Sequence, residues 1–479
     1  MTAARVLLIT ALVIVPCGVA QAHVSERAYI LLLPTHLYIV GGALVVALSF
    51  AVMALVPIAG LRALERVRFR LGRLPRHGAA VPSLCALAVA VALVVAGFIG
   101  SRDPLTNPLP VVVWSLWWVG LTFLHAVFGN LWAHLNPWRG AYHLLTLVPG
   151  LREGRDSPPL GYPRWAGHGP AIVVFLAFTW FELIHPAPLD PDLLASVVTA
   201  YLGATFVGML LFGERAWLRY GEAFSVFFRI VSWLSPLDPE QRHESGAGRA
   251  PPALSVTLPG IRLLKVGALP LGAAAFVLLA LASVSFDGLS RTFWWLDLIG
   301  VNPLEYPGRT DLIGANSLGL LGAFAALVAA YLAAVLLGHA LAGRKDSAGG
   351  RLGLFVVSIV PIAFGYHFAH YLPVFLIDAQ YAVRAISDPF ALGWNLFGTG
   401  DMHVTASLLS NHRSVELIWN LQVVVIVVAH VVAVVSAHFL SLRSTASVRE
   451  AILGQAPLAA LMIGYTLFGL WLLSTPAVG

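Results

Sequence analysis

The sequence predicts an all-α protein, a polytopic bundle of about ten transmembrane helices that follows a cleaved signal peptide. Of its 479 residues, 58% are hydrophobic and only 11% are charged, whereas a soluble domain carries about a quarter charged residues. Its mean hydropathy is +0.83. Since one bilayer span needs roughly 20 apolar residues, this length accommodates about ten spans and no large domain outside the membrane. The composition therefore excludes a water-soluble enzyme.

Residues 1–22 have the pattern of a secretory signal peptide. Arg5 supplies the positive charge, residues 6–15 form a short apolar core, and Ala20-Gln21-Ala22 is an A-x-A cleavage site. The apolar core is too short to cross a bilayer. The alternative is an uncleaved first helix. Cleavage would make His23 the first residue of the mature chain.

The rest of the chain, residues 23–479, is predicted to form a single transmembrane domain. Its apolar segments cover residues 34–58, 80–100, 110–131, 169–186, 194–213, 264–284, 315–342, 353–376, 416–441 and 456–474. If the mature N-terminus is periplasmic, every loop predicted to be cytoplasmic has at least as many Arg and Lys residues as its periplasmic neighbours, and all but the last have more, as the positive-inside rule predicts. We therefore expect a multi-pass protein of the bacterial inner membrane, in contact with lipid. We attribute the net charge of +6 to the arginines that orient the protein in the membrane, and we expect no nucleic-acid partner.

Two connecting segments are too long to be simple turns. The cytoplasmic segment near 214–263 alternates aromatic residues with arginines at near-helical spacing, which predicts an amphipathic helix lying at the membrane surface and then a linker at residues 246–252. A docking surface for a membrane-protein partner subunit is the alternative. The other long segment is periplasmic and covers residues 378–415.

Histidine is the residue type that most clearly suggests chemistry. The chain has 16 histidines and no P-loop, GxGxxG, HExxH, GxSxG or CxxC pattern. Several histidines fall on the side predicted to be periplasmic, together with the acids Glu182 and Asp378. Glu182/His185 and His367/His370 have the i, i+3 spacing that places two side chains on one helix face. The candidate metal ligands are His23, His36, His185, His367, His370 and His403. Asp378 and Glu182 are the candidate general bases, and either could instead be a ligand.

Ionisable side chains at membrane depth are costly and usually face a shared internal cavity. Imidazole nitrogens suit copper or zinc, and a free N-terminal His23 would add its amine to the ring nitrogen as a chelate that favours copper. Two other interpretations stay open. The same residues could form a structural polar network between helices, or they could line a path for protons or a solute.

Four strings in the chain carry a resemblance to a known group of proteins. AHVSERAYILLLP at residue 22, NPWRG at 136, GERAWLRYGEAFSVFFRIVSWLSPL at 213 and SFDGLSRTFWW at 285 resemble bacterial polytopic membrane proteins called fenitrothion hydrolases, along most of the mature chain. This resemblance implies hydrolysis of an organophosphorus triester. It supplies no catalytic motif that could be transferred to particular residues.

Two functional hypotheses use the same histidines. In the first, a metal-bound hydroxide attacks the phosphorus of an aryl phosphotriester, a small apolar substrate that reaches the periplasmic side through the lipid. In the second, the chain is a permease, or a membrane subunit that handles copper or assembles a metal cofactor. A transporter should place polar residues through the full membrane depth, and His430, with Asn420, Gln422 and His438, keeps that hypothesis open.

The arginine distribution makes a prediction about topology. A reporter that is active only in the periplasm should be active when fused after Leu298 and silent when fused after Arg344, because the intervening segment 315–342 crosses the membrane. Assays of the two fusions in cells would check this. The reverse pattern of activity would contradict the ten-helix topology.

Overall fold

The computed structural model describes residues 35–73, 80–145, 158–240, 253–302, 308–344, 348–409 and 411–475. The predicted signal peptide, His23 and the linker at residues 246–252 lie outside these residues. The first half contains α2 (Thr35–Ala54), α3 (Ile58–Glu65), β1 (Arg68–Arg73), α4 (Ala80–Ile99), α5 (Pro108–Val111), η1 (Val112–Gly120), α6 (Leu121–Phe128), α7 (Trp132–Leu135), α8 (Pro137–Leu145), α10 (Gly169–Leu183), α11 (Pro191–Phe212), α12 (Glu214–Ala216), η2 (Trp217–Gly221), α13 (Ala223–Val231), η3 (Ser232–Leu234) and β2 (Leu237–Glu240). The second half contains β3 (Ala253–Thr257), η4 (Ile261–Lys265), α14 (Leu271–Ser290), α15 (Phe293–Leu298), α16 (Arg309–Leu341), α17 (Gly349–Phe355), η6 (Val356–Ile359), α18 (Val360–Ser387), η7 (Ala406–Leu409), α19 (His412–Ser444) and α20 (Val448–Ser474).

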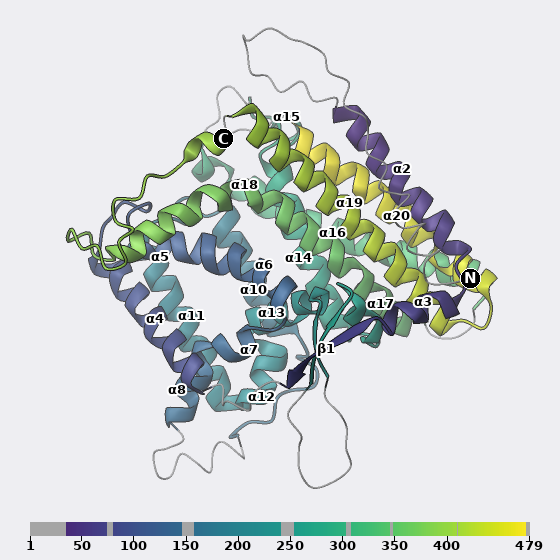
Figure 1. Ribbon diagram of the computed structural model, residues 1–479, viewed down its shortest axis with the longest axis horizontal. Helices are drawn as coiled ribbons and strands as arrows, with labels where there is room; N and C mark the ends of the chain where they lie inside the picture. Colours follow the sequence, from purple (N-terminus) through teal and green to yellow (C-terminus); the bar gives the residue numbers. More distant parts are fainter. Residues whose placement is uncertain are drawn as a thin grey trace.

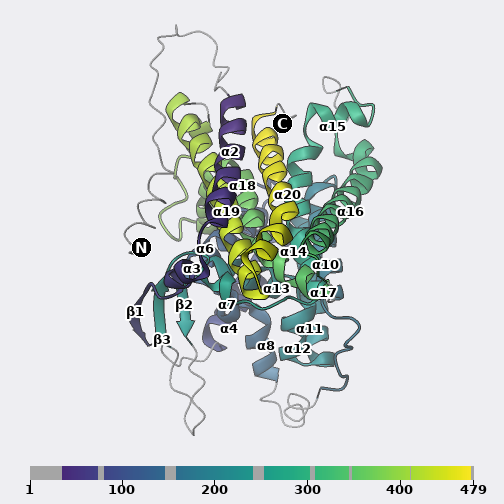
Figure 2. The same ribbon diagram turned by 90° about the vertical axis from the view of Figure 1, so that its right-hand side faces the viewer.

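The structure confirms a multi-pass, all-helical bundle. In the described part of the chain, nine helices are long and apolar enough to cross a membrane, and α10 is a shorter apolar helix of 15 residues. Together they account for each of the ten apolar segments of the sequence. The long helices run side by side between two ends of the molecule (Figures 1 and 2). One end carries α15, and the other carries α3, α8, α12 and the three strands.

The core of the bundle lies around α14 and α18. These helices and the preceding α17 are mostly buried, whereas α2 and α4 leave most of their surface exposed at the periphery. The exposed side chains of α4 are Val, Phe and Ile, as expected for a helix that faces lipid hydrocarbon. The central helices therefore offer the environment in which polar side chains are shielded from lipid.

A small antiparallel sheet was not predicted from the sequence. Its strand order is β1-β3-β2, so it joins the loop after the first span to the loop before α14. Arg68 pairs with Thr257 and Leu237 pairs with Val256 across the two ladders. Such pairing connects residues that are far apart in sequence, and the strands are only four to six residues long. Neither feature is visible in a hydropathy pattern.

Part of the segment expected to lie at the membrane surface, the helix α13, is instead buried in the bundle. Seven of the nine residues of α13 are buried, and its phenylalanines pack against η1, α6 and α10. Glu222 caps this helix, since its carboxylate accepts hydrogen bonds from the N–H groups of Phe224 (2.8 Å) and Ser225 (2.6 Å) and from the hydroxyl of Tyr201. The expectation was wrong because an apolar helix face has the same periodicity whether it meets lipid or protein.

The predicted periplasmic segment also begins later than expected. The helix α18 continues to Ser387, so Asp378 lies within it rather than at the start of a loop. The helix carries Pro373 in its interior without ending there. Residues 388–411 then connect α18 to α19, and His403 lies in this connection.

Close packing of α16 on α20 depends on glycine at position 338. A Cβ atom added to Gly338 would lie 2.1 Å from the carbonyl oxygen of Gly454. Because the obstacle is backbone, it cannot move aside as a side-chain end can. We predict that Gly338→Ala destabilises the purified protein by about 1–3 kcal/mol, measured as a lower midpoint of thermal unfolding in detergent.

The matched control lies on the same helix. A Cβ at Gly322 would meet no atom within 4 Å, so Gly322→Ala should leave the unfolding midpoint unchanged or slightly higher, since alanine favours helix. Equal behaviour of the two variants would contradict the described contact between α16 and α20.

Candidate functional site

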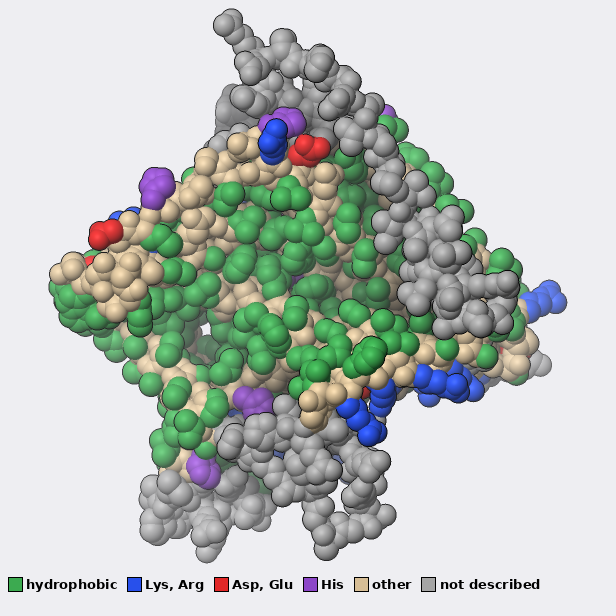
Figure 3. All heavy atoms as spheres, in the orientation of Figure 1, with side chains coloured by type: hydrophobic (Ala, Val, Ile, Leu, Met, Phe, Trp, Pro, Cys, Tyr) green, Lys and Arg blue, Asp and Glu red, His purple; other side chains and the backbone are tan. Residues whose placement is uncertain are grey.

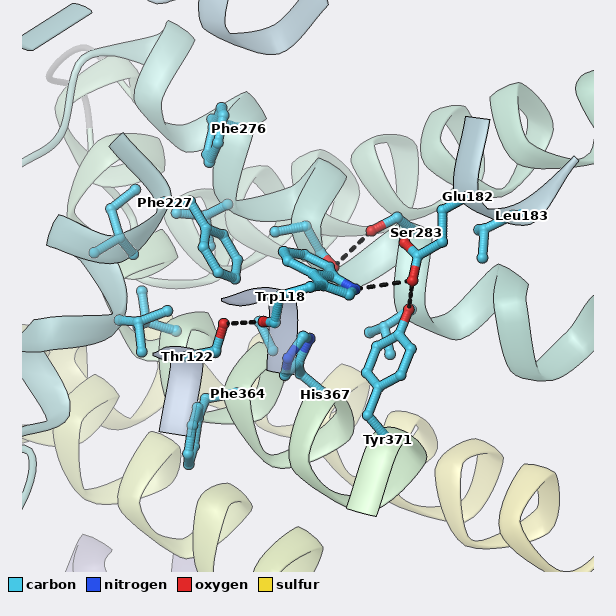
Figure 4. A pocket seen from close by; sticks show the side chains of 17 residues that line it. Trp118, Thr122, Glu182, Leu183, Phe227, Phe276, Ser283, Phe364, His367 and Tyr371 are labelled. Atoms are coloured by element: carbon cyan, nitrogen blue, oxygen red, sulfur yellow. Dashed lines mark hydrogen bonds between the residues drawn. The ribbon is translucent and has the colours of Figure 1, made fainter. Parts of the chain in front are cut away.

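A small cavity lies in the middle of the bundle, between η1, α10, α13, α14 and α18. Its volume is about 30 Å³, which is room for roughly one or two water molecules. Most of its wall is apolar and aromatic, with Phe227, Phe276 and Phe364 among the lining residues. The polar lining residues are Trp118, Thr122, Glu182, Ser283, His367 and Tyr371. Figure 4 shows this arrangement.

The carboxylate of Glu182 is the centre of the polar side of this cavity. Its Oε1 atom accepts hydrogen bonds from the indole N–H of Trp118 and from the hydroxyl of Tyr371, both at 2.8 Å. The two donors come from different helices, η1 and α18, and their side chains converge on the carboxylate (Figure 4). At the end of α10, the guanidinium group of Arg309 donates hydrogen bonds to the backbone carbonyl oxygens of Glu182 and His185, at 2.9 and 3.3 Å.

His367 lies against the same cavity and keeps one ring nitrogen without a partner. The residue is 5% exposed, and its Nε2 atom makes no hydrogen bond in the structure. Its ring meets Trp118 edge to face, with the ring centroids 4.8 Å apart, and lies 4.7 Å from the ring of Tyr371. A buried nitrogen of this kind is costly unless a water or ligand satisfies it, and the adjacent cavity offers space for a water.

A second carboxylate, Asp287, forms a pair of ionic contacts next to this cavity. Asp287 Oδ2 lies 2.6 Å from His370 Nε2, and Oδ1 lies 3.3 Å from a guanidinium nitrogen of Arg291. The side chain of Asp287 is 3% exposed, whereas those of His370 and Arg291 are 28% and 46% exposed. The cluster thus connects a buried acid to side chains that reach the surface.

The carboxylates of Glu182 and Asp287 influence each other electrostatically. Asp287 lies close enough to Glu182 and to Tyr371 to interact with both electrostatically. Two carboxylates in a medium of low polarity repel each other when both are ionised, and a proton taken up by either one relieves the repulsion. The ring of His370 lies 2.6 Å from one of the two carboxylates, that of Asp287.

Irregular helices bring these side chains together. Trp118 belongs to η1, a π-helical stretch of nine residues within a spanning helix, and such stretches often occur at functional sites. A 3₁₀ stretch, η6, interrupts the span that carries His367, His370 and Tyr371. The buried helix α13 contributes Phe227 and Ile230 to the wall of the cavity, and Phe227 lies across the cavity from Glu182 (Figure 4).

The structure brings three of the predicted site residues into one region. Glu182 and His367 line the same cavity, and His370 follows one turn later on α18. His185 lies just beyond α10, where its Nδ1 atom accepts a hydrogen bond from the N–H of Ala187 at 3.1 Å. Asp378 is half-buried on α18, two turns beyond Tyr371.

The remaining predicted ligands do not join this group. His36 is exposed on α2, a helix that packs on α19 and α20, and His403 is exposed in the connection after α18. His23 lies outside the described residues. In the described part of the chain, no three His, Cys, Asp or Glu side chains are grouped so that they could hold a metal ion. A copper or zinc site that includes these residues stays a prediction.

Sequence analysis did not identify Asp287, Trp118 or Tyr371. The apolar segment predicted from the sequence ends at residue 284. The helix α14 continues to Ser290 and therefore includes Asp287. A signal was present, since Asp287 and Arg291 have the i, i+4 spacing of an ion pair on a helix. Trp118 and Tyr371 belong to apolar segments in which nothing in the sequence distinguishes a hydrogen-bond donor from a packing residue.

Polar side chains also occur deeper in the bundle, along α19. Gln422, His430 and His438 are buried. The side-chain amide of Gln422 donates to the carbonyl of Ala369 at 2.6 Å, and Gln455 contacts His438 Nδ1 at 2.6 Å. The Nε2 atoms of both histidines make no hydrogen bond. Polar groups are therefore spread along the membrane-spanning length of this helix.

No protein-family model, no curated protein and no solved structure matches the chain. The resemblance to fenitrothion hydrolases stays a prediction.

Proposed function

We propose that this chain is a proton-coupled membrane transport protein, in which Glu182, Asp287 and His370 exchange a proton with the outer aqueous side. The observation that carries the proposal is that two buried carboxylates, Glu182 and Asp287, lie near each other inside an apolar bundle. Asp287 also contacts His370 and Arg291, whose side chains are partly exposed. Ionisable residues within membrane-spanning bundles commonly mark ion pathways and proton relays.

The distribution of polar groups supports transport over a reaction at one surface. A hydrolase needs polar residues only where its substrate enters, whereas a carrier needs them along its whole path. Buried His430 and His438 lie on α19 beyond the Glu182 cavity, each with an unsatisfied ring nitrogen. The cavity is also next to an irregular stretch of helix, since Trp118 belongs to the π-helical η1, and π-helical stretches often occur at functional sites.

The hydrolase hypothesis has less support from the geometry. Pockets that bind molecules of the size of an aryl phosphotriester have volumes of roughly 300–1,000 Å³, whereas the cavity at Glu182 has about 30 Å³. Protons and water fit this space and such a triester does not. A metal-handling role would need ligands beyond the described group, with His23 as one candidate.

The proposed orientation places the mature N-terminus on the periplasmic side of a bacterial inner membrane. The partly exposed side chains of His370 and Arg291 would face the same side. The arginine distribution supports this orientation. It also agrees with the position of the sheet and α3, which carry Arg62, Arg66 and Arg70 at the opposite end of the bundle from α15 (Figure 2).

Proton binding can be tested without knowing the transported solute. Purified protein in proteoliposomes is adsorbed to a solid-supported membrane, and the pH of the outer solution is stepped. Because protons would bind at a site inside the membrane, the wild type should give a transient capacitive current. Glu182→Gln removes the protonatable group while keeping the size of the side chain, and it should remove all but a residual current.

Glu416→Gln is the matched control, since it makes the same change at an acid whose side chain is 48% exposed. It should keep the wild-type current. An absent current in the wild type, or an unchanged one in Glu182→Gln, would contradict the proposal. Release of nitrophenol from fenitrothion by the same preparation, with no pH-step current, would favour the hydrolase instead.

A further inference from the structure

The segment between the first two spans presents an unusual combination of exposed side chains. The helix α3 begins four residues after α2 ends, and β1 follows it directly. Here Phe69 and Leu71 are 71% and 61% exposed, and Arg62, Arg66 and Arg70 are exposed as well. We call these five residues the α3–β1 surface. Large exposed apolar side chains next to several cations are typical of elements that lie in a membrane interface.

This surface is held in a fixed position against the bundle. Leu61 on the inner face of α3 is 2% exposed and packs in a cluster with Ile261, Leu264 and Phe439. The strand β1 is bonded along one edge to β3, while its other edge is not paired within the three-stranded sheet. The exposed arginines and apolar residues are therefore presented by a scaffold that is anchored on α19 and η4.

One acid on a neighbouring strand of the sheet, Asp238, is paired with two cations. Asp238 on β2 lies 2.6 Å from Lys265 Nζ and 3.7 Å from Arg262 Nε. This carboxylate is 12% exposed, so it is enclosed by its own cations and does not offset the charge of Arg62, Arg66 and Arg70. Residues 58–73 contain one acid, Glu65, and five arginines, so the segment that carries the α3–β1 surface has a positive net charge next to apolar side chains.

The space-filling view places this charge at the border of the lipid-facing surface. Arg and Lys side chains gather along the lower right edge of the hydrophobic surface in Figure 3, where Figure 1 shows α3 and the start of β1. A lipid headgroup meets the protein at such a border, since the acyl chains contact the apolar surface and the phosphate lies at its edge.

We propose that the α3–β1 surface binds anionic phospholipids of the leaflet that it faces. Arg62, Arg66 and Arg70 would contact the phosphate and glycerol headgroups, and Phe69 and Leu71 would insert among the first carbons of the acyl chains. The charge of the lipid decides binding at this site, so phosphatidylglycerol is preferred over phosphatidylcholine. Arginine suits this task because its guanidinium group can bind a phosphate with two parallel hydrogen bonds.

The test uses the full chain, purified in a neutral detergent and titrated with phosphatidylglycerol or phosphatidylcholine. Native mass spectrometry resolves each bound lipid and gives its Kd. The wild type should retain phosphatidylglycerol preferentially, and added salt should weaken that preference. In Arg66→Gln/Arg70→Gln, the affinity for phosphatidylglycerol should fall by roughly fivefold for each arginine removed, with no change for phosphatidylcholine.

Two controls make the outcome decisive. Arg66→Lys/Arg70→Lys keeps both charges and should retain most of the preference, which separates lost charge from lost folding. Arg384→Gln/Arg413→Gln removes two exposed arginines at the opposite end of the bundle and should behave as the wild type. Equal affinity of the wild type for the two lipids, an unchanged affinity in Arg66→Gln/Arg70→Gln, or an equal loss in the Arg384/Arg413 control would overturn the proposal.

Discussion

The cost of holding carboxylates inside an apolar bundle is the constraint on which the centre of this structure depends. Lipid offers no hydrogen-bond partners, so each polar group at membrane depth has to find its partners within the protein. Glu182 receives two donors on one oxygen, and Asp287 is held between His370 and Arg291. Replacing buried charged groups by well-packed apolar residues is often neutral or stabilising. Our proposal of a protonation role for Glu182 and Asp287 rests on this comparison.

The irregular features of the fold follow from that constraint. A regular helix through residues 112–120 would rotate Trp118 relative to the rest of its span, and the π-helical turn of η1 sets the direction in which the indole N–H points. The buried α13 needs its own cap within the bundle, and Glu222 provides it. Aromatic side chains from η1, α10 and α13 then fill the space around the cavity. The site is thus small, and its polar atoms are fixed by packing.

Much of the fold could be predicted from the sequence, because the hydrocarbon thickness imposes apolar runs of a definite length. Each predicted apolar segment is a helix, and His367 and His370 lie one turn apart on α18. That Glu182 and His367 line one cavity depends on how the helices pack. Other features depend on contacts that a single sequence does not display. The sheet forms by pairing between loops that are distant in sequence. The helix α13 has an apolar face that could pack against lipid or against protein. Asp287 lies where the hydropathy of the sequence falls, although the helix α14 continues past it. His36 has the same residue type as His367 but lies on a peripheral helix, a difference that only packing decides.

The central claim is that Glu182 gains and loses a proton in the working protein. Infrared difference spectroscopy of the reconstituted full chain, recorded between acidic and alkaline buffer, detects the C=O stretch of a protonated carboxyl group directly. The account predicts a carboxyl band that changes with pH, that is absent in Glu182→Gln, and that shifts in Tyr371→Phe because one hydrogen bond to the same oxygen is lost. A spectrum of Glu182→Gln identical to that of the wild type would contradict it.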